Sequence, residues 1–376
     1  MISLHVLGTA SARPANGRSV SGSILSMAHG GVLVDCGEGF QERFTAHNRR
    51  LGVADGMTKV RRSRLEAVML THGHLDHTWG VLPFLQTMGL DGRTRPLTII
   101  GPTRQDVLRK LGTPGTSLPE DLPAVDLARQ FQIWRDLGAN EHHLGFPIRW
   151  VLIAADGSQA MEWMASGEHR QLESIPQPLK GAHIRPLETR HSVPSCAWSV
   201  STEAKVGRFD RDRVDRLGLD AAQRRTLANG APIELEDGTH LRPEDLRGPE
   251  RPGRCIVVSG DTGANPPGYQ SVDHPVDLLV HEATFLEEHR QAADRWLHCT
   301  ASDAAEAATM IGATALALTH FSSRLTSTTT SLEEARDRFP NTLAIEDGDV
   351  LTLGPEGSLL HHRWHHDGFR CMPTIR

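Results

Sequence analysis

The sequence predicts an α/β fold, in which helices cover β-sheets. Three observations support this prediction. Short runs of apolar and β-branched residues recur along the chain, and each ends in polar residues or glycine, as strands do. Helical patterns lie between some of these runs. The 376 residues are 38% hydrophobic, which suffices for a packed core, and no apolar run approaches the ~18 residues of a membrane span.

The expected strands and helices follow one another over most of the chain. Strands are expected at residues 4–7, 31–34, 67–70, 97–100, 149–154, 184–187, 254–258, 278–280, 315–318 and 350–353. Helices are expected at residues 39–48, 81–88, 104–110, 301–310 and 331–338. Thr300 or Ser302 is a candidate N-cap for the fourth helix and Thr330 for the fifth, because their hydroxyls can accept hydrogen bonds from the first turn. We expect a single domain that spans residues 1–376.

Two long segments and the C-terminal tail depart from this pattern. Residues 103–182 are polar and interrupted by proline and glycine, and we expect them to form an insertion or a lid. Residues 201–253 are charged, which on composition alone indicates a solvated helical face. Residues 361–366 contain four histidines and could bind metal loosely, but an exposed, mobile end is the commoner outcome for such a tail.

Composition narrows the location and the class of partner. The five cysteines are odd in number and form no Cys-x-x-Cys pair, which fits a reducing cytosol better than a disulfide framework. The N-terminus lacks the basic region and the cleavage site of a signal peptide. We therefore expect a cytoplasmic protein without a membrane partner. The formal net charge of −6 does not indicate a broad nucleic-acid-binding surface, although the count includes carboxylates that could ligate metal.

Histidine is abundant, with 21 residues, and one cluster of histidines indicates a metal site. This cluster directly follows the expected strand 67–70 and reads Thr71-His72-Gly73-His74-Leu75-Asp76-His77. Because the chain turns after a strand, several of these side chains can point into one volume. Catalytic zinc prefers such nitrogen and oxygen ligands and leaves one position for water. A purely structural origin does not explain three imidazoles and a carboxylate within six residues.

Polar residues also follow four other expected strands. They are His191, Asp261, the pair His281-Glu282, and His320. A single such residue is more often a cap or a turn residue, but four at the same end of successive strands are expected to meet at one sheet edge. Rival ligands are Cys36, Cys196 and Cys299, which lack paired spacing; a free cysteine is often only a small buried apolar residue.

Taken in order, these motifs resemble the metallo-β-lactamase superfamily and, within it, the ribonuclease Z branch, which trims the 3′ trailer from precursor tRNA. The resemblance covers most of the chain and implies an αββα sandwich, with two mixed β-sheets flanked by helices. The superfamily signature is His72-x-His74-x-Asp76-His77. The segments His281-Glu282-Ala283-Thr284 and Pro252-Gly253-Arg254 narrow the resemblance to the branch. Other matching segments are residues 7–12, 35–39, 95–102, 191–195, 235–238, 248–254, 259–262 and 318–321.

The resemblance implies roles for individual residues. One divalent ion would be held by His72, His74 and His191, and the other by Asp76, His77 and His320, with Asp261 bridging the two. Asp76 would thus act as a ligand within the catalytic site. His298 would contact the scissile phosphate or help the leaving group, and Glu282 would orient His298. Asp35 would support the site in a similar way.

The chemistry implied is metal-dependent hydrolysis of a phosphodiester. Two divalent ions ~3.5–4 Å apart could hold a bridging hydroxide, and a histidine could protonate the departing sugar oxygen. Zn²⁺ is the expected metal, and Mn²⁺ suits the same donors. The implied substrate is precursor tRNA, and relatives of this branch are commonly homodimers.

Some residues depart from the family pattern and leave an alternative open. Residues 207–210 keep the start of the family's flexible tRNA-gripping arm, but residues 217–222 lack its Pro-Pro-Gly-Pro, so residues 201–253 would be a degenerate substrate-binding arm. Gly263 replaces a frequent arginine, Ala197 replaces a frequent glycine, and Leu75 is typical of class II cyclic-nucleotide phosphodiesterases. The alternative is therefore a phosphodiesterase of the same superfamily that acts on small molecules or cyclic nucleotides. A thioester or lactam hydrolase fits His298 poorly, and a non-catalytic binding protein does not explain the complete ligand set.

Overall fold

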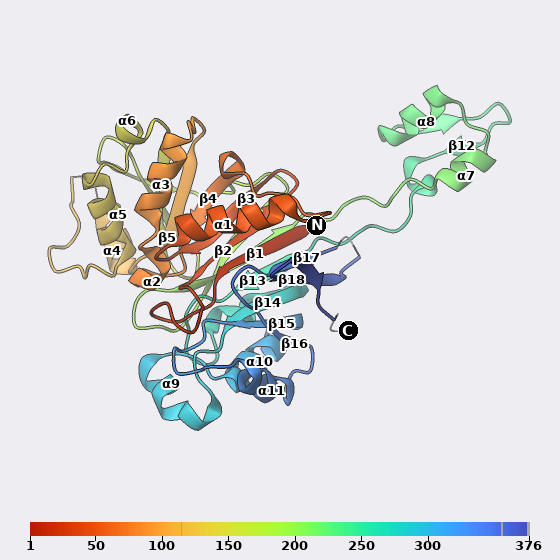
Figure 1. Ribbon diagram of the computed structural model, residues 1–376. Helices are drawn as coiled ribbons and strands as arrows, with labels where there is room; N and C mark the ends of the chain where they lie inside the picture. Colours follow the sequence, from red (N-terminus) through yellow and green to blue (C-terminus); the bar gives the residue numbers. More distant parts are fainter. Residues whose placement is uncertain (114, 355, 374–376) are drawn as a thin grey trace. The chain divides into compact units, whose positions relative to one another are not determined.

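The computed structural model describes residues 1–113, 115–354 and 356–373 (Figure 1). The chain divides into two compact units, one formed by Met1–Ser201 with Cys255–Arg376 and the other by Thr202–Arg254. The second unit matches the charged segment 201–253 to within one residue at each end. The single domain over residues 1–376 stays a prediction, because a unit of this size can be an arm of the same domain. Within the described ranges, every helix is too short or too polar to cross a lipid bilayer.

The larger sheet contains eleven strands among the described residues, in the order β19-β18-β17-β1-β2-β3-β4-β5-β6-β7-β8. They are β1 (Ile2–Gly8), β2 (Gly22–Met27), β3 (Gly30–Cys36), β4 (Leu65–Met69), β5 (Leu97–Pro102), β6 (Ile148–Ile153), β7 (Ala160–Trp163), β8 (His169–Leu172), β17 (Val350–Leu353), β18 (Leu359–His365) and β19 (Gly368–Cys371). Strands β3 to β6 are parallel, and the pairs on either side of them are antiparallel. The sheet is therefore mixed.

The smaller sheet has six strands in the described part of the chain, in the order β16-β15-β14-β13-β10-β9. They are β9 (Ala182–Glu188), β10 (Cys196–Thr202), β13 (Cys255–Val258), β14 (Val276–Glu282), β15 (Ala313–Thr319) and β16 (Thr342–Ala344). Strands β13 to β16 are parallel, whereas β10 is antiparallel to β13. This sheet is also mixed.

Helices cover the outer faces of the two sheets (Figure 1). The helices of the larger unit are α1 (Phe40–Val53), α2 (Leu75–Thr78), α3 (Val81–Leu90), α4 (Gln105–Leu111), α5 (Leu127–Asp136), α6 (Glu141–Leu144), α9 (Arg290–Trp296), α10 (Ala301–Met310) and α11 (Thr329–Arg336), in the described part of the chain. Helices α1, α3 and α5 pack on the larger sheet, and α10 packs on the smaller sheet.

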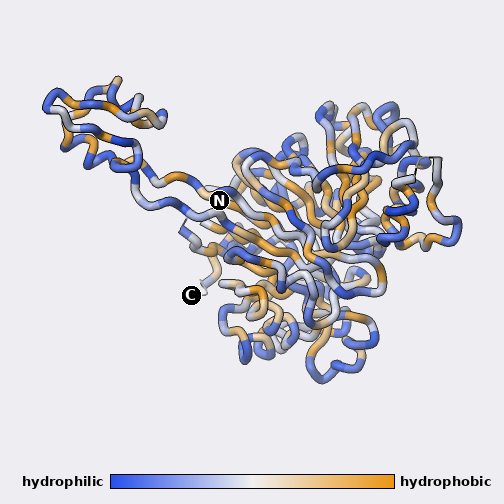
Figure 2. The backbone as a smooth tube through the Cα atoms, turned by 180° about the vertical axis from the view of Figure 1, so that it is seen from behind, coloured by the Kyte–Doolittle hydropathy of each residue, from blue (hydrophilic) through white to orange (hydrophobic). Residues whose placement is uncertain are grey.

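A central apolar layer joins the two sheets. Leu4, Val32 and Met69 of the larger sheet share one buried cluster with Trp198 and Ile256 of the smaller sheet. Figure 2 shows apolar stretches along the interior strands of both sheets. One further cluster lies between each sheet and its helices. The predicted αββα sandwich of two mixed sheets is confirmed.

Each of the ten expected strands and five expected helices is present, with shifts of a few residues at the ends. Thr300 caps α10, because its hydroxyl accepts from the backbone N–H of Asp303. Thr330 is wrong as the cap of the last helix, since α11 already begins at Thr329. The expected mobile tail is also wrong. Most of residues 361–366 form β18, and His361 is buried with its Nε2 2.7 Å from an oxygen of Asp349.

Residues 103–182 contribute α4, α5, α6, β6, β7 and β8. Strand β6 pairs in parallel with β5, and its residues Val151, Leu152 and Ile153 are fully buried. This part of the segment therefore belongs to the larger sheet. A role of the remaining residues as an insertion or a lid over a substrate stays a prediction.

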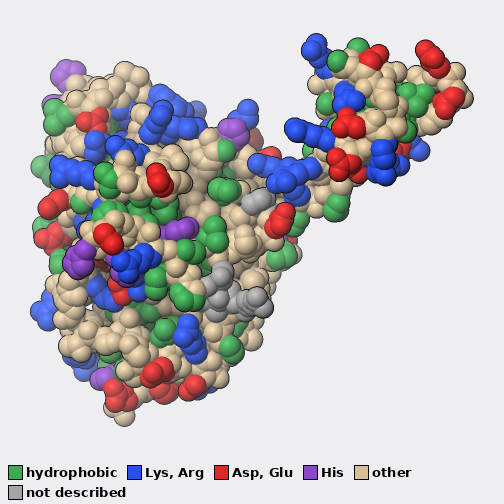
Figure 3. All heavy atoms as spheres, turned by 45° about the vertical axis from the view of Figure 1, so that its right-hand side comes forward, with side chains coloured by type: hydrophobic (Ala, Val, Ile, Leu, Met, Phe, Trp, Pro, Cys, Tyr) green, Lys and Arg blue, Asp and Glu red, His purple; other side chains and the backbone are tan. Residues whose placement is uncertain are grey.

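The unit Thr202–Arg254 folds around a small apolar cluster of its own. It contains α7 (Arg211–Arg216), α8 (Ala221–Ala228), β11 (Ile233–Glu234) and β12 (His240–Leu241). Val214, Leu227 and Leu246 are buried in its cluster. Asp220 and Gln223 form a capping box at the start of α8. The segment is thus an ordered helical unit with charged residues on its surface (Figure 3).

Candidate metal centre

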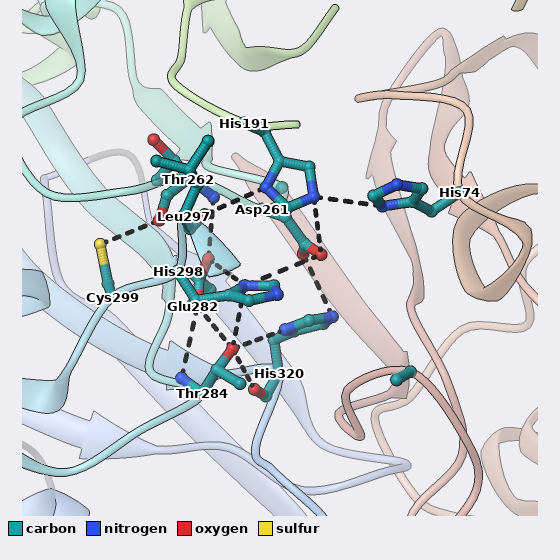
Figure 4. Close-up of polar contacts among 12 residues, drawn as sticks. His74, His191, Asp261, Thr262, Glu282, Thr284, Leu297, His298, Cys299 and His320 are labelled. Carbon is teal, nitrogen blue, oxygen red and sulfur yellow. Dashed lines mark hydrogen bonds and ion pairs between the residues drawn. The ribbon is translucent and has the colours of Figure 1, made fainter. Parts of the chain in front are cut away.

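The predicted site residues follow strands of both sheets, and their candidate ligand atoms gather in one place. His72 and His74 follow β4, Asp261 follows β13, and His320 follows β15. Since β13 and β15 flank β14 and are both parallel to it, their carboxyl ends lie at the same end of the smaller sheet. His191 leaves β9, and Figure 4 shows it pointing toward His74 and Asp261.

The first cluster consists of His72, His74, His191 and Asp261, whose candidate ligand atoms all lie within 4.8 Å of one another. His74 Nδ1 lies 3.0 Å from His72 Nε2 and 3.1 Å from His191 Nε2. Asp261 Oδ2 lies 3.7 Å from His72 Nε2 and 3.9 Å from His191 Nε2. Three imidazole nitrogens and one carboxylate oxygen thus face one point.

The second cluster consists of Asp76, His77, Asp261 and His320, within the same 4.8 Å limit. Asp261 Oδ1 lies 3.2 Å from His77 Nε2 and 3.1 Å from His320 Nε2. Asp76 Oδ2 lies 3.5 Å from His77 Nε2 and 3.6 Å from His320 Nε2. Asp261 therefore presents one oxygen to each cluster, as a bridging ligand would.

Three buried polar atoms in these clusters lack a hydrogen-bond partner among the described residues. They are Nε2 of His77, Nε2 of His320 and Oδ1 of Asp261. The two nitrogens face the same carboxylate oxygen at 3.2 and 3.1 Å without forming a hydrogen bond, an arrangement that a cation between them would explain. The donor sets, three nitrogens with one oxygen and two nitrogens with two oxygens, suit zinc. The residues present therefore fit two divalent ions.

The outward-facing nitrogens of the imidazoles are held by hydrogen-bond partners, which would fix the inward nitrogens as ligands. His77 Nδ1 lies 2.7 Å from Asp35 Oδ2, and His191 Nδ1 lies 3.0 Å from the Leu297 carbonyl oxygen. His320 Nδ1 lies 2.9 Å from the hydroxyl oxygen of Thr284. The contact of Asp35 fits its predicted supporting role. The partners Leu297 and Thr284 were not predicted from the sequence.

The backbone is strained at three of these positions. Asp35, Leu297 and His320 have φ values of 59°, 54° and 58°, in the left-handed region that non-glycine residues rarely occupy. Such strain gathers at functional sites, where the surrounding structure enforces it. Here it orients two residues that support histidines and one predicted ligand.

The charges within the clusters shift the pKa values strongly. Burial would raise the pKa of Asp261, but His320 and His77 hold it well below its ordinary value. The pKa of Asp76 is likewise lowered to about 2, despite burial, by His77 and His320. Burial and the neighbouring histidines lower the pKa of His74 to about 4. Ionised carboxylates and a neutral imidazole are the forms that bind metal.

His298 and Glu282 form a separate pair beside Asp261. Glu282 Oε1 lies 2.8 Å from His298 Nδ1 and accepts from the backbone N–H of Thr262 at 2.8 Å. Glu282 is fully buried, whereas His298 is 15% exposed. Burial would lower the pKa of His298, but Glu282 and Asp261 raise it to about 9. His298 therefore holds a proton at neutral pH that it can donate.

The rival cysteine ligands lie outside the clusters found among the described residues. Cys36, Cys196 and Cys299 are fully buried, and burial raises the pKa of each thiol. Cys299 donates its S–H to the Thr262 carbonyl oxygen. These thiols are small packing residues, as the absence of paired spacing indicated.

Comparison with known proteins agrees with this geometry. Residues 28–158 match the model of the metallo-beta-lactamase superfamily. Ribonuclease Z of Halobacterium salinarum is 33% identical over 321 residues, covering 85% of this chain and 86% of the relative. Ribonuclease Z of Myxococcus xanthus is 30% identical over 356 residues, covering 94% and 98%.

Solved structures agree on the fold. The crystal structure of the short form of human tRNase Z superposes with a TM-score of 0.54 at 20% identity, covering 94% of this chain and 99% of that one. The metallo-beta-lactamase fold protein YhfI of Bacillus subtilis superposes with a TM-score of 0.55 at 17% identity, covering 93% and 98%. The family implies divalent metal ions. The chain therefore belongs to the ribonuclease Z family of the metallo-β-lactamase superfamily and is a metal-dependent hydrolase.

Proposed function

We propose that this protein is an endoribonuclease that removes the 3′ trailer from precursor tRNA with two zinc ions. The relatives named ribonuclease Z support this proposal, since they match 85% and 94% of the chain. The observation that carries it is the His298–Glu282 pair at the edge of two clusters that share Asp261. A phosphodiester needs both charge neutralisation and a proton for the departing oxygen, and this arrangement provides for both.

The metal ligands in this proposal divide between the two clusters. His72, His74 and His191 would hold one ion, Asp76, His77 and His320 would hold the other, and Asp261, which belongs to both groups, would contribute to each site. When bound, the two ions lower the pKa of water, so that a nucleophile exists at neutral pH, and neutralise the phosphate. Mn²⁺ fits the same donors, so zinc is the expected metal rather than the necessary one.

His298 is the general acid of the proposed reaction. Glu282 fixes its Nδ1 at 2.8 Å, which leaves Nε2 for the departing sugar oxygen. The negative charge of Glu282 keeps the proton on the ring, because it stabilises the imidazolium form. His298 and Glu282 also lie within 4.8 Å of His320 in a third group of candidate ligand atoms. A metal-content assay of His298→Ala separates the two roles, since loss of a ligand would lower bound metal.

The unit Thr202–Arg254 serves as the substrate-binding arm in this proposal. Its arginines Arg208, Arg211 and Arg213 are exposed and can contact phosphates. Figure 3 shows acidic side chains among the basic ones on this unit, which limits its affinity for RNA. The resemblance to ribonuclease Z also suggests a homodimer in the cytoplasm.

The test is turnover by the zinc-loaded protein of a 3′-extended precursor tRNA, measured beside a small aryl phosphodiester and 3′,5′-cyclic AMP. We expect cleavage directly after the discriminator base, with an Asp261→Ala variant as the inactive control. Turnover of only the small esters would contradict the tRNA assignment and favour the alternative phosphodiesterase.

A further inference from the structure

The loop between the two histidines of the first cluster packs against the start of helix α5. A Cβ atom added to Gly73 would lie 1.9 Å from the carbonyl oxygen of Val125 and 3.4 Å from Nε2 of Gln130. The first distance is far below any real contact, so only glycine fits here. The backbone of the loop and the backbone before α5 therefore meet without an intervening side chain.

Gln130 makes the polar contact between α5 and this loop. Its Nε2 donates a hydrogen bond to the Gly73 carbonyl oxygen at 2.5 Å, and the side chain is only 4% exposed. Its neighbours on the buried face of α5 are apolar residues, among them Leu127, Phe131 and Trp134. The other amide atom, Oε1, is buried without a hydrogen-bond partner among the described residues.

A purely structural role explains this glutamine poorly. Burying an amide with one unpaired atom costs more than burying a leucine or methionine of similar volume. Packing alone would therefore favour an apolar residue at position 130. The residue makes sense if its bond to Gly73 has a function that outweighs this cost.

Helix α5, which carries Gln130, is attached to the larger sheet by polar and apolar contacts. Asp126 caps the helix and accepts from the Ala128 backbone N–H at 2.9 Å and from the Thr103 hydroxyl at 2.7 Å. Thr103 directly follows β5, so this bond ties the helix to the larger sheet. The rings of Phe131 and Trp150 pack with centroids 5.0 Å apart, which ties α5 to β6 as well.

We propose that Gln130 is a positioning residue for the first metal-binding cluster, acting through the Gly73 carbonyl group. Gly73 joins His72 to His74, so the orientation of its peptide groups sets where both imidazoles point. Asp35 holds the other side of the loop, where it accepts from the Thr71 backbone N–H at 2.8 Å. Gln130 thus completes the support of the loop from α5. This inference rests on the proposed metal ligands and requires no particular substrate.

The experiment compares Gln130→Met with Gln132→Met. Methionine keeps the length and the helix propensity of glutamine but cannot donate to Gly73. Gln132 lies on the same helix and accepts from Arg129 at 2.7 Å, so its variant controls for loss of a glutamine from α5. Cobalt(II) is titrated into each metal-free protein, and its affinity and visible absorption spectrum are recorded beside the melting temperature of the metal-free protein.

We expect Gln130→Met to bind one of the two cobalt ions about 10- to 100-fold more weakly, with altered visible bands, because partners that orient ligands have effects of this size. Gln132→Met is expected to bind like the wild type. If Gln130→Met does not fold, Gln130→Leu replaces it in the same comparison.

Wild-type affinity and spectrum in the Gln130 variant would overturn the inference, whatever the change in melting temperature. Equal loss of affinity in both variants would also overturn it, since the effect would then belong to α5 in general. A wild-type protein that binds no cobalt would overturn the metal centre itself, which separates failure of the proposed function from failure of this inference.

Discussion

Replacing Asp35 by asparagine tests how the histidine beside it is held. Asp35 Oδ1 accepts from the Thr71 backbone N–H at 2.8 Å, and Oδ2 lies 2.7 Å from His77 Nδ1. Asparagine has the same shape and tolerates the left-handed backbone at φ 59°. If its oxygen stays on Thr71, its NH₂ group faces His77 Nδ1, which must then become an acceptor.

Metal binding requires His77 to be neutral, and this change places its one remaining proton on Nε2, the nitrogen that faces Asp261 at 3.2 Å. A protonated Nε2 has no lone pair for a metal ion. The opposite amide orientation sets an NH₂ group against the Thr71 N–H in a buried site. Because either orientation leaves two donors opposed or a ligand blocked, we expect binding of the second ion to weaken about 10- to 100-fold, or about 1.4–2.7 kcal/mol.

The assay is zinc affinity by competition with a chromophoric chelator. The matched control is Asp349→Asn, which alters a second buried aspartate at hydrogen-bond distance, 2.7 Å, from a histidine, His361. The control should lower thermal stability and leave zinc affinity unchanged. Equal zinc affinity in Asp35→Asn and the wild type would refute the reasoning on the tautomer of His77.

The remaining predictions concern the acid pair, the metals and acid stability. His298→Ala and Glu282→Gln should keep both ions but lose about 10²- to 10⁴-fold in turnover, measured with metal content on the same samples; loss of an ion would mean that a ligand had been removed. Chelation of the ions should lower the melting temperature and expose the clusters to faster hydrogen exchange, because bound metal stabilises only the folded state; an unchanged melting temperature would contradict this. Burial and the neighbouring His47 lower the pKa of His5 from 6.5 to about 3. Burial and Arg50 lower the pKa of His47 to about 4. Below pH 6.5 these two imidazoles therefore bind more protons in the unfolded chain than in the folded one. Stability should therefore fall as the pH drops below 6.5, by about 2 kcal/mol for each imidazole at pH 5. In His47→Gln, the loss measured by urea unfolding between pH 7 and pH 5 should be about 2 kcal/mol smaller than in the wild type. An equal loss in the two proteins would refute the assignment.

The parts of the fold that the sequence predicts are those with a local signal. Strand β4 is an apolar run that ends shortly before the His72–His77 motif, and both features can be read within thirteen residues. Strand β10 was missed because it is buried on both faces and contains small residues such as Ser199, so it lacks apolar–polar alternation. Strand β2 begins with glycine and serine, and these small residues weaken the apolar pattern that predicts a strand.

In the candidate site too, the residues with a local sequence signal are predicted and the others are not. Its predicted ligands follow strands, and parallel strands bring such residues together. The residues that support them come from distant parts of the chain with no local pattern: Leu297 contacts His191 through a carbonyl group, and Gln130 contacts a loop 57 residues away. A carbonyl group is present at every residue, and a single glutamine on an amphipathic helix gives no signal. Such partners depend on the tertiary structure and cannot be found from spacing.

Anomalous diffraction at the zinc absorption edge, from crystals of the zinc-loaded protein, tests the central claim most directly. The account predicts two peaks roughly 3.5–4 Å apart. One should lie against His72, His74 and His191, the other against Asp76, His77 and His320, with Asp261 between them. A single peak, or zinc bound only at the histidines of residues 361–366, would contradict the account.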